Sequence, residues 1–488
     1  MPPLLSKSKY LTGLQCLKYL WTQIHEAERI PEADAITQYI FDQGHLVGNY
    51  AKQLFPGGIG IPHDDFMENI AATKQLLAKR KPLFEAGILS GRIYCRLDIL
   101  APVNEGEWDI IEIKSGTSVK EVYINDVSFQ KFCCEKAGLR IRTCKLGFIN
   151  KQYVKKGEIS PKELFLLEDV STQVEEISEG IEERVSNLLE VISNKACPEM
   201  TIGQHCLAPY ECPLRAECWG FLPENSVFDL RGGRTKQFAL FEQGISAIKD
   251  IPADMPLSRQ QQIQKVCVLT GNVHVEKEEI RQFLNKLKYP LYYLDFETVG
   301  PAIPVYDGTR PYQDMPFQFS LHVVESEGSE PVHHSFLAEG VEDPRPQILH
   351  ELRGLLGSEG SIIAYNAGFE EGVLKELVEA FPEYTDWLEG ILTRTVDLLF
   401  PFTNFHYYNA SQKDTASLKK VLPAVTGKGY EEMGIGAGMD ASIAYGRIMY
   451  GNATEDEIAG VRADLLKYCK LDTEGMVWVV DKLRELSD

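Results

Sequence analysis

The sequence predicts a mixed α/β protein in which two sheet-containing domains are joined by a helical connector. Strand-like apolar runs gather in two separate zones of the chain, and helical periodicity follows each zone. The length of 488 residues corresponds to roughly three domains at about 150 residues each. The composition, 44% hydrophobic and 25% charged, is typical of a globular chain that can bury large cores. We therefore expect three domains, at residues 1–220, 221–288 and 289–488.

The first domain opens with helical segments and continues as paired strands followed by helices. Alternating apolar residues indicate the strands, and apolar residues at helical spacing indicate the helices. The last helix is rich in Glu on one face, so we expect that face to lie in solvent. The expected elements are strands at 91–100 and 108–115 around a turn at 103–106, a helix at 119–137, a strand at 140–149 and an amphipathic helix at 173–191.

The connector at 221–288 is polar and has little strand signal, so it is expected to be helical. Its Gly244-Ile245 pair, placed between short helical segments, resembles the hairpin of a helix-hairpin-helix element.

The third domain is expected to begin with three consecutive strands and to continue with alternating helices and a strand. This order predicts an α/β sheet of the ribonuclease-H-like kind. A stretch at 427–438 contains five glycines and is expected to form a loop. The expected elements are strands at 291–296, 316–324, 332–337 and 361–365 and helices at 346–356, 370–380, 417–421 and 455–483.

The charge distribution argues against a surface built for nonspecific DNA coating. The formal net charge is −21. Residues 1–150 carry 18 Lys and Arg against 17 Asp and Glu, whereas residues 301–488 carry 15 against 31. A near-neutral first part and a strongly acidic last part are compatible with different roles.

Targeting signals are not expected, and we predict a cytoplasmic protein with no membrane association. Residues 1–14 contain no apolar signal-peptide core, and no run approaches the roughly 18 apolar residues of a membrane span. The 11 cysteines are an odd number, which argues against a disulfide framework in such a compartment. Several of them lie in apolar runs and are expected to be core residues: Cys95, Cys133, Cys134, Cys144 and Cys469.

Asp98, Glu112 and Lys114 form the first candidate site. Glu112 and Lys114 are two apart on an expected strand and therefore project from the same face, and Asp98 lies on the preceding strand. Two acids from adjacent strands can hold a divalent metal, and a neighbouring lysine can position water and offset phosphate charge. An ordinary strand with a salt bridge is the alternative.

These residues resemble the site of PD-(D/E)xK nucleases of the RecB-like type. That family adds a His on an early helix and a later Gln, which His45 and Gln130 match. The usual Tyr four residues after the Gln is Cys134 in this sequence. The resemblance implies catalytic roles for His45, Asp98, Glu112, Lys114 and Gln130, with Asp98 and Glu112 as metal ligands.

Four cysteines form the second candidate site. Cys206, Cys212 and Cys218 are close together, with Pro209 and Pro213 forcing turns between them. Three thiolates need a fourth ligand, for which Cys16 is the candidate. The arrangement resembles the iron–sulfur clasp of AddB-type and CRISPR-associated RecB-like nucleases, which implies a 4Fe-4S cluster that joins the two ends of the domain. Structural zinc, with His205 as a possible ligand, and unliganded thiols are the alternatives.

Five residues form the third candidate site: Asp295, Glu297, Glu370, Tyr468 and Asp472. Asp295 and Glu297 share one strand face, and Tyr468 and Asp472 share one helix face. The three segments resemble the motifs of DEDD exonucleases of the DnaQ-like group, with Glu370 at a position that is usually Asp. The resemblance implies four carboxylates that hold two Mg²⁺ or Mn²⁺ ions, and a tyrosine that orients the attacking water.

Two further segments accompany this third site. Asp397 is a rival carboxylate, for which a structural role is expected because it follows the second motif. The Ser417–Lys420 segment resembles one that often precedes the third motif, where it supports the substrate; the start of a solvated helix is an equal alternative.

Taken over nearly the whole chain, the sequence resembles a bacterial family that couples an iron–sulfur RecB-like nuclease domain to a DEDD-type exonuclease domain. The resemblance implies a metal-dependent nuclease with two active centres that acts on single-stranded DNA or DNA ends, in DNA repair or in defence against mobile elements. The DEDD centre would be a 3′–5′ exonuclease, and the RecB-like centre would cut or trim DNA. An RNA-processing exonuclease and a nucleic-acid-binding module with a degenerate centre are the alternatives.

Overall fold

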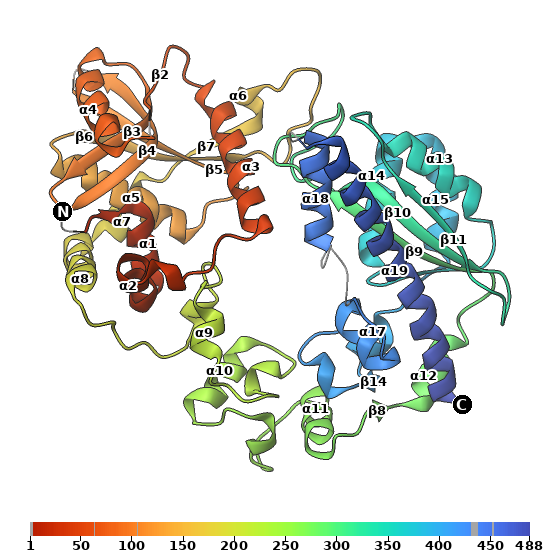
Figure 1. Cartoon of the computed structure of the whole chain (residues 1–488). Helices are drawn as coiled ribbons and strands as arrows, with labels where there is room; N and C mark the ends of the chain where they lie inside the picture. Colours follow the sequence, from red (N-terminus) through yellow and green to blue (C-terminus); the bar gives the residue numbers. More distant parts are fainter. Residues whose placement is uncertain (1–2, 63, 105, 431–437, 451–452) are drawn as a thin grey trace. The chain divides into compact units, whose positions relative to one another are not determined.

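The chain is described here by a computed structural model covering residues 3–62, 64–104, 106–430, 438–450 and 453–488 (Figure 1). It divides into two compact units. Unit 1 comprises Met1–Phe221 and Pro301–Tyr312, and unit 2 comprises Leu222–Gly300 and Gln313–Asp488. Each unit contains sheets and helices, so the protein is a mixed α/β protein. Most of the glycine-rich stretch expected to form a loop at 427–438 lies outside the described residues.

Unit 1 is built on a sheet of seven strands within its described residues. The strand order is β2-β3-β4-β5-β6-β7, and β1 pairs in parallel with β4. β3, β4 and β5 are antiparallel neighbours, whereas β5 and β6 are parallel and are joined by the crossover helix α5 (Figure 1). The strands are β1 (Leu5–Ser6), β2 (Ile59–Gly60), β3 (Leu83–Ser90), β4 (Ile93–Asn104), β5 (Glu107–Lys114), β6 (Arg140–Ile149) and β7 (Phe165–Asp169).

The helices of unit 1 cover this sheet. Apolar residues of α1, α5, α7 and α8 share one core with β3, β4, β5 and β6, while α3 packs in a second core with the ends of β6 and β7. The helices are α1 (Lys7–Gln15), α2 (Leu17–His25), α3 (Ala35–Lys52), α4 (Phe66–Leu76), α5 (Glu121–Lys136), α6 (Pro161–Leu164), α7 (Ser171–Ser178), α8 (Ile181–Ser193) and α9 (Arg215–Trp219).

The long helix expected at 173–191 is two helices in the structure. α7 ends at Ser178 and α8 begins at Ile181. Between them Gly180 has a φ of 72°, a left-handed conformation that breaks a helix and that glycine adopts at no steric cost. The apolar face is nevertheless continuous, because Val174 and Leu188 are both buried in the same core.

Unit 2 is built on a five-stranded sheet with the order β11-β10-β9-β12-β13 within its described residues. β9, β10 and β11 form an antiparallel meander, and β12 and β13 continue the sheet in parallel with β9. A short pair, β8 and β14, lies apart from it. The strands are β8 (His274–Val275), β9 (Leu291–Val299), β10 (Met315–Val324), β11 (Val332–Leu337), β12 (Ser361–Ala364), β13 (Thr395–Asp397) and β14 (Tyr407–Tyr408).

The two faces of β9 belong to two different cores. Its even-numbered apolar residues pack against α13, α14 and α15, whereas its odd-numbered ones pack against α12, α17 and α19. The helices are α10 (Arg234–Glu242), α11 (Arg259–Thr270), α12 (Lys277–Leu284), α13 (Arg345–Leu355), α14 (Gly368–Ala380), α15 (Thr385–Leu392), α16 (Phe400–Thr403), α17 (Leu418–Thr426), α18 (Gly438–Tyr450) and α19 (Glu455–Ser487).

The division of the chain differs from the expected domains in two places. Residues 222–288, expected to be a separate connector, belong to unit 2, and β8 within them pairs with β14. Residues 301–312, expected in the third domain, belong to unit 1, where Ile303 is buried and the Ala302 amide donates a hydrogen bond to Gln43 at 3.2 Å.

The expected helix-hairpin-helix element is also different. α10 precedes the Gly244-Ile245 pair, but a 3-10 turn at Ile248–Asp250 follows it instead of a second α-helix. The chain turns there because Gly244 has a φ of 82°. No helix in the described ranges of either unit is both long and apolar enough to cross a membrane.

Candidate functional site

Four carboxylates of unit 2 converge on one pocket, and we call Asp295, Glu297, Glu370 and Asp472 the carboxylate centre. Asp295 and Glu297 project from the face of β9 that packs against α19, because both are odd-numbered. Asp472 comes from α19. Glu370 lies in the first turn of α14, directly after β12. The structure therefore brings together residues that lie more than a hundred positions apart in the sequence.

Burial and mutual repulsion perturb these carboxyl groups. Burial, with the charges of Asp472 and Glu297, raises the pKa of Asp295 well above its usual range. Burial likewise raises the pKa of Glu297 well above its usual range, that of Glu370 to about 8 and that of Asp472 to about 6. Carboxyl groups that are buried beside one another without matching cations resist ionisation, and a bound cation would reverse this.

One oxygen of the carboxylate centre has no donor. Glu370 is 4% exposed, and its Oε2 atom is buried without a hydrogen-bond partner among the described residues. Burying such an oxygen costs free energy unless something pairs with it. A divalent cation would supply that partner, so the donor set fits a metal of this kind.

Aromatic and basic side chains complete the pocket wall. Tyr468 and Lys419 both line it, and the Lys419 ammonium lies 5.0 Å from the centre of the Tyr468 ring. The Tyr430 hydroxyl donates a hydrogen bond to Asp472 Oδ1. Lys419 lies in the segment expected to support a substrate, but Tyr430 was not predicted, since no helical or strand spacing links it to Asp472.

Asp397, the rival carboxylate, holds a loop in place. Its Oδ1 atom accepts hydrogen bonds from the backbone amides of Asn366 and Leu399, both at 2.9 Å. Asn366 has a φ of 74°, so this hydrogen bond fixes a left-handed backbone just before α14 and thereby positions Glu370.

The second group of residues lies in unit 1, and Glu112 on β5 is its most buried charged member. Glu112 is 1% exposed. Its Oε1 atom accepts hydrogen bonds from Lys114 and Lys7, both at 2.7 Å, and its Oε2 atom accepts one from Gln130 at 2.8 Å. Lys114 and Gln130 are predicted site residues, whereas Lys7, in the first turn of α1, was not predicted. Its position 105 residues from Glu112 leaves no spacing signal.

Asp126 is a second unpredicted member of this group. It is 2% exposed, and its carboxylate accepts hydrogen bonds from Lys114 at 2.6 Å and from Gln130 at 2.9 Å. Asp126 lies one helical turn before Gln130 on α5, so their spacing of four residues is the signal that could have identified it. We call Asp98, Glu112, Asp126, Lys7, Lys114 and Gln130 the lysine centre.

Asp98, on β4, lies beside the other residues of the lysine centre. Its Oδ2 atom accepts a hydrogen bond from the backbone amide of Ile113 at 2.8 Å, where the regular pairing of β4 with β5 ends. Burial opposes the charged form of Lys114, but the carboxylates of Asp126, Glu112 and Asp98 outweigh it and raise the pKa of Lys114 well above its usual range.

His45 is the predicted site residue that the structure does not link to this group. It is exposed on α3, and within the described ranges no side chain forms a hydrogen bond or ion pair with its ring. The buried side of α3 is formed by Val47 and Ala51 instead.

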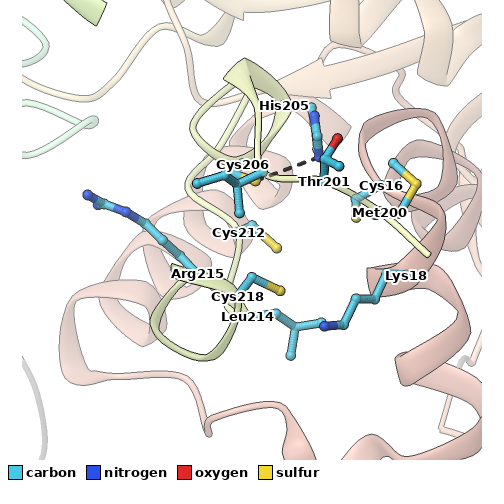
Figure 2. Close-up of a pocket in the computed structure, with 11 residues that line it drawn as sticks. Cys16, Lys18, Met200, Thr201, His205, Cys206, Cys212, Leu214, Arg215 and Cys218 are labelled. Atoms are coloured by element: carbon cyan, nitrogen blue, oxygen red, sulfur yellow. Dashed lines mark hydrogen bonds between the residues drawn. The ribbon is translucent and has the colours of Figure 1, made fainter. Parts of the chain in front are cut away.

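Four cysteines line a third site, the cysteine pocket (Figure 2). Cys16 reaches it from the junction of α1 and α2, and Cys206, Cys212 and Cys218 reach it from the segment around α9. The Cys212 amide donates to the Cys206 carbonyl at 2.9 Å, which folds the segment around the sulfurs. Burial raises the pKa of the Cys212 thiol to about 11, and the charges of the other three cysteines add to this.

Neighbouring side chains hold the cysteine pocket closed. The Gln15 amide donates to the carbonyls of His205 and Tyr210, at 2.8 and 2.7 Å, and so joins α1 to the cysteine segment. The His205 ring lies 3.6 Å from the Cys206 sulfur. The other expected core cysteines, Cys95, Cys133, Cys134, Cys144 and Cys469, are all buried, as predicted.

The chain is similar to one domain family and to several curated proteins. A family model described as a domain of unknown function, DUF2779, matches residues 292–417, a range that includes Asp295, Glu297 and Glu370. The "Uncharacterized protein UU173" of Ureaplasma parvum is 24% identical over 227 residues, which cover 42% of this chain and 32% of that protein. The "Uncharacterized protein MG366" of Mycoplasma genitalium is 26% identical over 222 residues, covering 41% and 33%. The chain thus matches about a third of the length of these curated relatives.

Proposed function

We propose that the protein is a metal-dependent nuclease with two catalytic centres, the carboxylate centre and the lysine centre. One observation carries the proposal: Asp295, Glu297, Glu370, Tyr468 and Asp472, five residues from three sequence segments, line one pocket of unit 2. Four carboxylates with perturbed pKa values in one pocket are typical of a functional site that binds cations.

The topology of each unit supports the finer fold assignment. The meander β9-β10-β11 followed by parallel β12 and β13 agrees with a ribonuclease-H-like DEDD domain. The adjacent strands β4 and β5, which carry Asp98, Glu112 and Lys114, and the helix α5, which carries Gln130, agree with a PD-(D/E)xK domain of the RecB-like type.

In the carboxylate centre, the four acids would hold two Mg²⁺ or Mn²⁺ ions, which supply activation of water and neutralisation of the leaving oxygen. The residues of the chain do the positioning. Tyr430 orients the Asp472 carboxylate through its hydrogen bond. Tyr468 is 4% exposed at the pocket wall, where its hydroxyl can orient the attacking water. Lys419 adds positive charge beside the place that a phosphate would occupy.

In the lysine centre, Asp98 and Glu112 are the carboxylates that would hold a divalent ion. Gln130 and the two lysines fix the Glu112 carboxylate before any ion binds. Lys114 is held between Glu112 and Asp126, and it can offset the charge of a phosphate in the transition state. Within the described ranges the His45 ring forms no hydrogen bond or ion pair, so its proposed catalytic role is carried by the resemblance.

The substrate we propose is single-stranded DNA or a DNA end, with 3′–5′ trimming by the carboxylate centre and cutting or trimming by the lysine centre. DNA repair and defence against mobile elements are the proposed settings, with the cytoplasm as the location. The same chemistry would process RNA, so RNA is included in the assay below.

For the cysteine pocket we propose a 4Fe-4S cluster. Tetrahedral zinc at about 2.3 Å from each sulfur would place the sulfurs about 3.8 Å apart. All four cysteines are described residues, and no three of their sulfurs lie within 4.8 Å of one another. This wider spacing, with thiols from both ends of the unit, supports a cluster over a single zinc ion.

The assay for the cluster is iron content after anaerobic purification. We expect stoichiometric iron in the wild type and its loss in Cys212→Ser, together with lower stability of unit 1, because metal binding and folding are coupled. Cys144→Ser, which changes a buried thiol outside the pocket, is the matched control. Stoichiometric zinc without iron in the wild type would contradict the assignment.

The assay for the two centres uses end-labelled single-stranded DNA and RNA, with free and blocked 3′ ends, in Mg²⁺ or Mn²⁺. Asp472→Asn should abolish 3′–5′ trimming, whereas Asp481→Asn, an exposed acid on the same helix α19, should not. Lys114→Met should remove the second activity, and the exposed Lys120→Met should retain it.

The double variant Asp472→Asn, Lys114→Met decides the proposal. We expect it to lack both activities and to retain the fold. Full activity in the double variant, or no activity of the wild type on either nucleic acid, would refute the nuclease proposal and favour a binding module.

A further inference from the structure

Cys469 lies against the carboxylate centre, although its sequence context is that of a core residue. It follows Tyr468 on α19 and is three residues before Asp472. It is fully buried, and its sulfur lies 3.4 Å from Asp295 Oδ2. A small apolar side chain would fill the same space, so packing alone does not require sulfur next to a carboxylate oxygen.

The sulfur and two carboxylates have the spacing of a metal site. Asp295, Glu297 and Cys469 each offer one possible ligand atom, and these three atoms lie within 4.8 Å of one another. Among the described His, Cys, Asp and Glu residues, this is the group of three with such spacing. Ligands at about 2.0 to 2.3 Å from one ion lie at most about 4.6 Å apart. The three atoms can therefore reach a common ion with small side-chain movements.

An independent observation indicates that a cation belongs in this pocket. Glu370 lines it together with Asp295 and Glu297, and the buried Oε2 atom of Glu370 has no hydrogen-bond partner among the described residues. A thiol is a weak donor, so its contact with Asp295 compensates little of the charge gathered there. A bound cation would give both the Glu370 Oε2 atom and the Cys469 sulfur an interaction partner.

We propose that Cys469 is a metal ligand of the carboxylate centre and that it gives the centre a preference for a thiophilic divalent cation, such as Zn²⁺ or Co²⁺, over Mg²⁺. Carboxylates alone suit Mg²⁺ and Mn²⁺, whereas a thiolate selects softer ions. The thiol releases its proton to solvent when the sulfur binds the ion. This inference rests on the proposed function, and it replaces Mg²⁺ or Mn²⁺ with a softer divalent ion at the metal position of the carboxylate centre that Cys469 adjoins.

The experiment measures metal binding by the full chain, without an activity assay. Zn²⁺ and Mn²⁺ affinities are measured by calorimetry, and Co²⁺ binding is followed by the near-ultraviolet absorption that arises when a thiolate binds cobalt. The proteins are wild type, Cys469→Ser and Cys267→Ser, a control that alters another buried thiol of unit 2. The cysteine pocket of unit 1 is the same in all of them, so its contribution cancels.

We expect Cys469→Ser to lose at least about tenfold in Zn²⁺ affinity and to lose part of the cobalt–thiolate absorption, while Mn²⁺ affinity changes much less. Cys267→Ser should match the wild type. Asp295→Asn, which leaves the thiol in place, should reduce the same absorption, and this variant tests the proposal even if Cys469→Ser does not fold.

Two results would overturn the inference, and they are distinguishable. If Mn²⁺ binding depends on Asp295 but neither Zn²⁺ affinity nor cobalt absorption depends on Cys469, the carboxylate centre binds metal and Cys469 is not a ligand. If no divalent ion binds in an Asp295-dependent way, the metal-dependent function of the centre fails together with the inference.

Discussion

Neutralising Glu370 should stabilise the metal-free protein, and the gain should depend on pH. Burial raises the pKa of Glu370 from its ordinary 4.5 to about 8. The folded chain therefore binds more protons than the unfolded chain between about pH 4.5 and 8, and stability falls as pH rises through this window. At about 1.4 kcal/mol for each pH unit, the loss reaches at most about 5 kcal/mol above pH 8. Glu370→Gln carries no charge and should avoid this loss.

The assay is hydrogen exchange of metal-free protein, read by mass spectrometry in peptides from α14 and β9, because this method reports the stability of the part of the chain around Glu370. At pH 4.5 the variant should equal the wild type within about 1 kcal/mol, and at pH 8.5 it should be more stable by several kcal/mol. Glu371→Gln is the matched control, since Glu371 is the next residue and pairs with Lys375 at 3.0 Å on the surface.

Equal pH dependence in the wild type and in Glu370→Gln would refute this reasoning. It would mean that the Glu370 carboxyl group finds a partner that compensates its charge, and that the pocket needs no cation to be stable. A gain in Glu371→Gln as large as that in Glu370→Gln would refute it as well, since the effect would then reflect the general charge of α14.

Two further changes test the neighbours of the centres. Lys7→Met should lower the stability of unit 1 by about 1 to 3 kcal/mol, because Glu112 loses one charged partner but keeps Lys114. Urea unfolding measures this loss. Lys9→Met is the control and should have a smaller effect. Tyr430→Phe should raise the pKa of Asp472 above about 6, because it removes a hydrogen bond that favours the ionised carboxylate. The pH midpoint of Mn²⁺ binding should then move upward. An unchanged midpoint would count against the hydrogen bond between Tyr430 and Asp472.

The sequence predicted some strands with the bounds that they have in the structure. The strands expected at 140–149 and 332–337 have those bounds in the structure. The helix expected at 173–191 failed at Gly180, because its apolar face runs through the break and hides it from a periodicity argument. The assignment of residues 301–312 to unit 1 is a tertiary effect, and no local pattern reports where a loop packs.

Site residues were predictable where they are close in sequence or match a motif. Asp295, Glu297, Tyr468 and Asp472 were predicted from the resemblance to exonuclease motifs, and strand and helix spacing puts each pair on one face. The structure places all four in one pocket. Lys7 and Cys469 could not be found in this way. Lys7 lies 105 residues before Glu112, and the sequence around Cys469 is that of a core cysteine, with nothing to show that Asp295 lies beside it.

The two centres differ in how their charges are balanced, and this explains why only one of them should depend on cations for its stability. In the lysine centre, the ammonium groups of two lysines are hydrogen-bonded to two of the three carboxylates, those of Glu112 and Asp126. The third carboxylate, that of Asp98, accepts a hydrogen bond from the Ile113 amide. In the carboxylate centre, four carboxylates line a pocket in which Lys419 is the one basic residue among the described lining residues. All four carboxyl groups have raised pKa values. Repulsion among these carboxylates lowers the stability of the metal-free protein. Divalent ions relieve the repulsion when they bind, and an ion that binds only the folded chain stabilises it. The instability expected of Glu370 at high pH and the affinity of the pocket for metal are therefore two consequences of the same arrangement of acids.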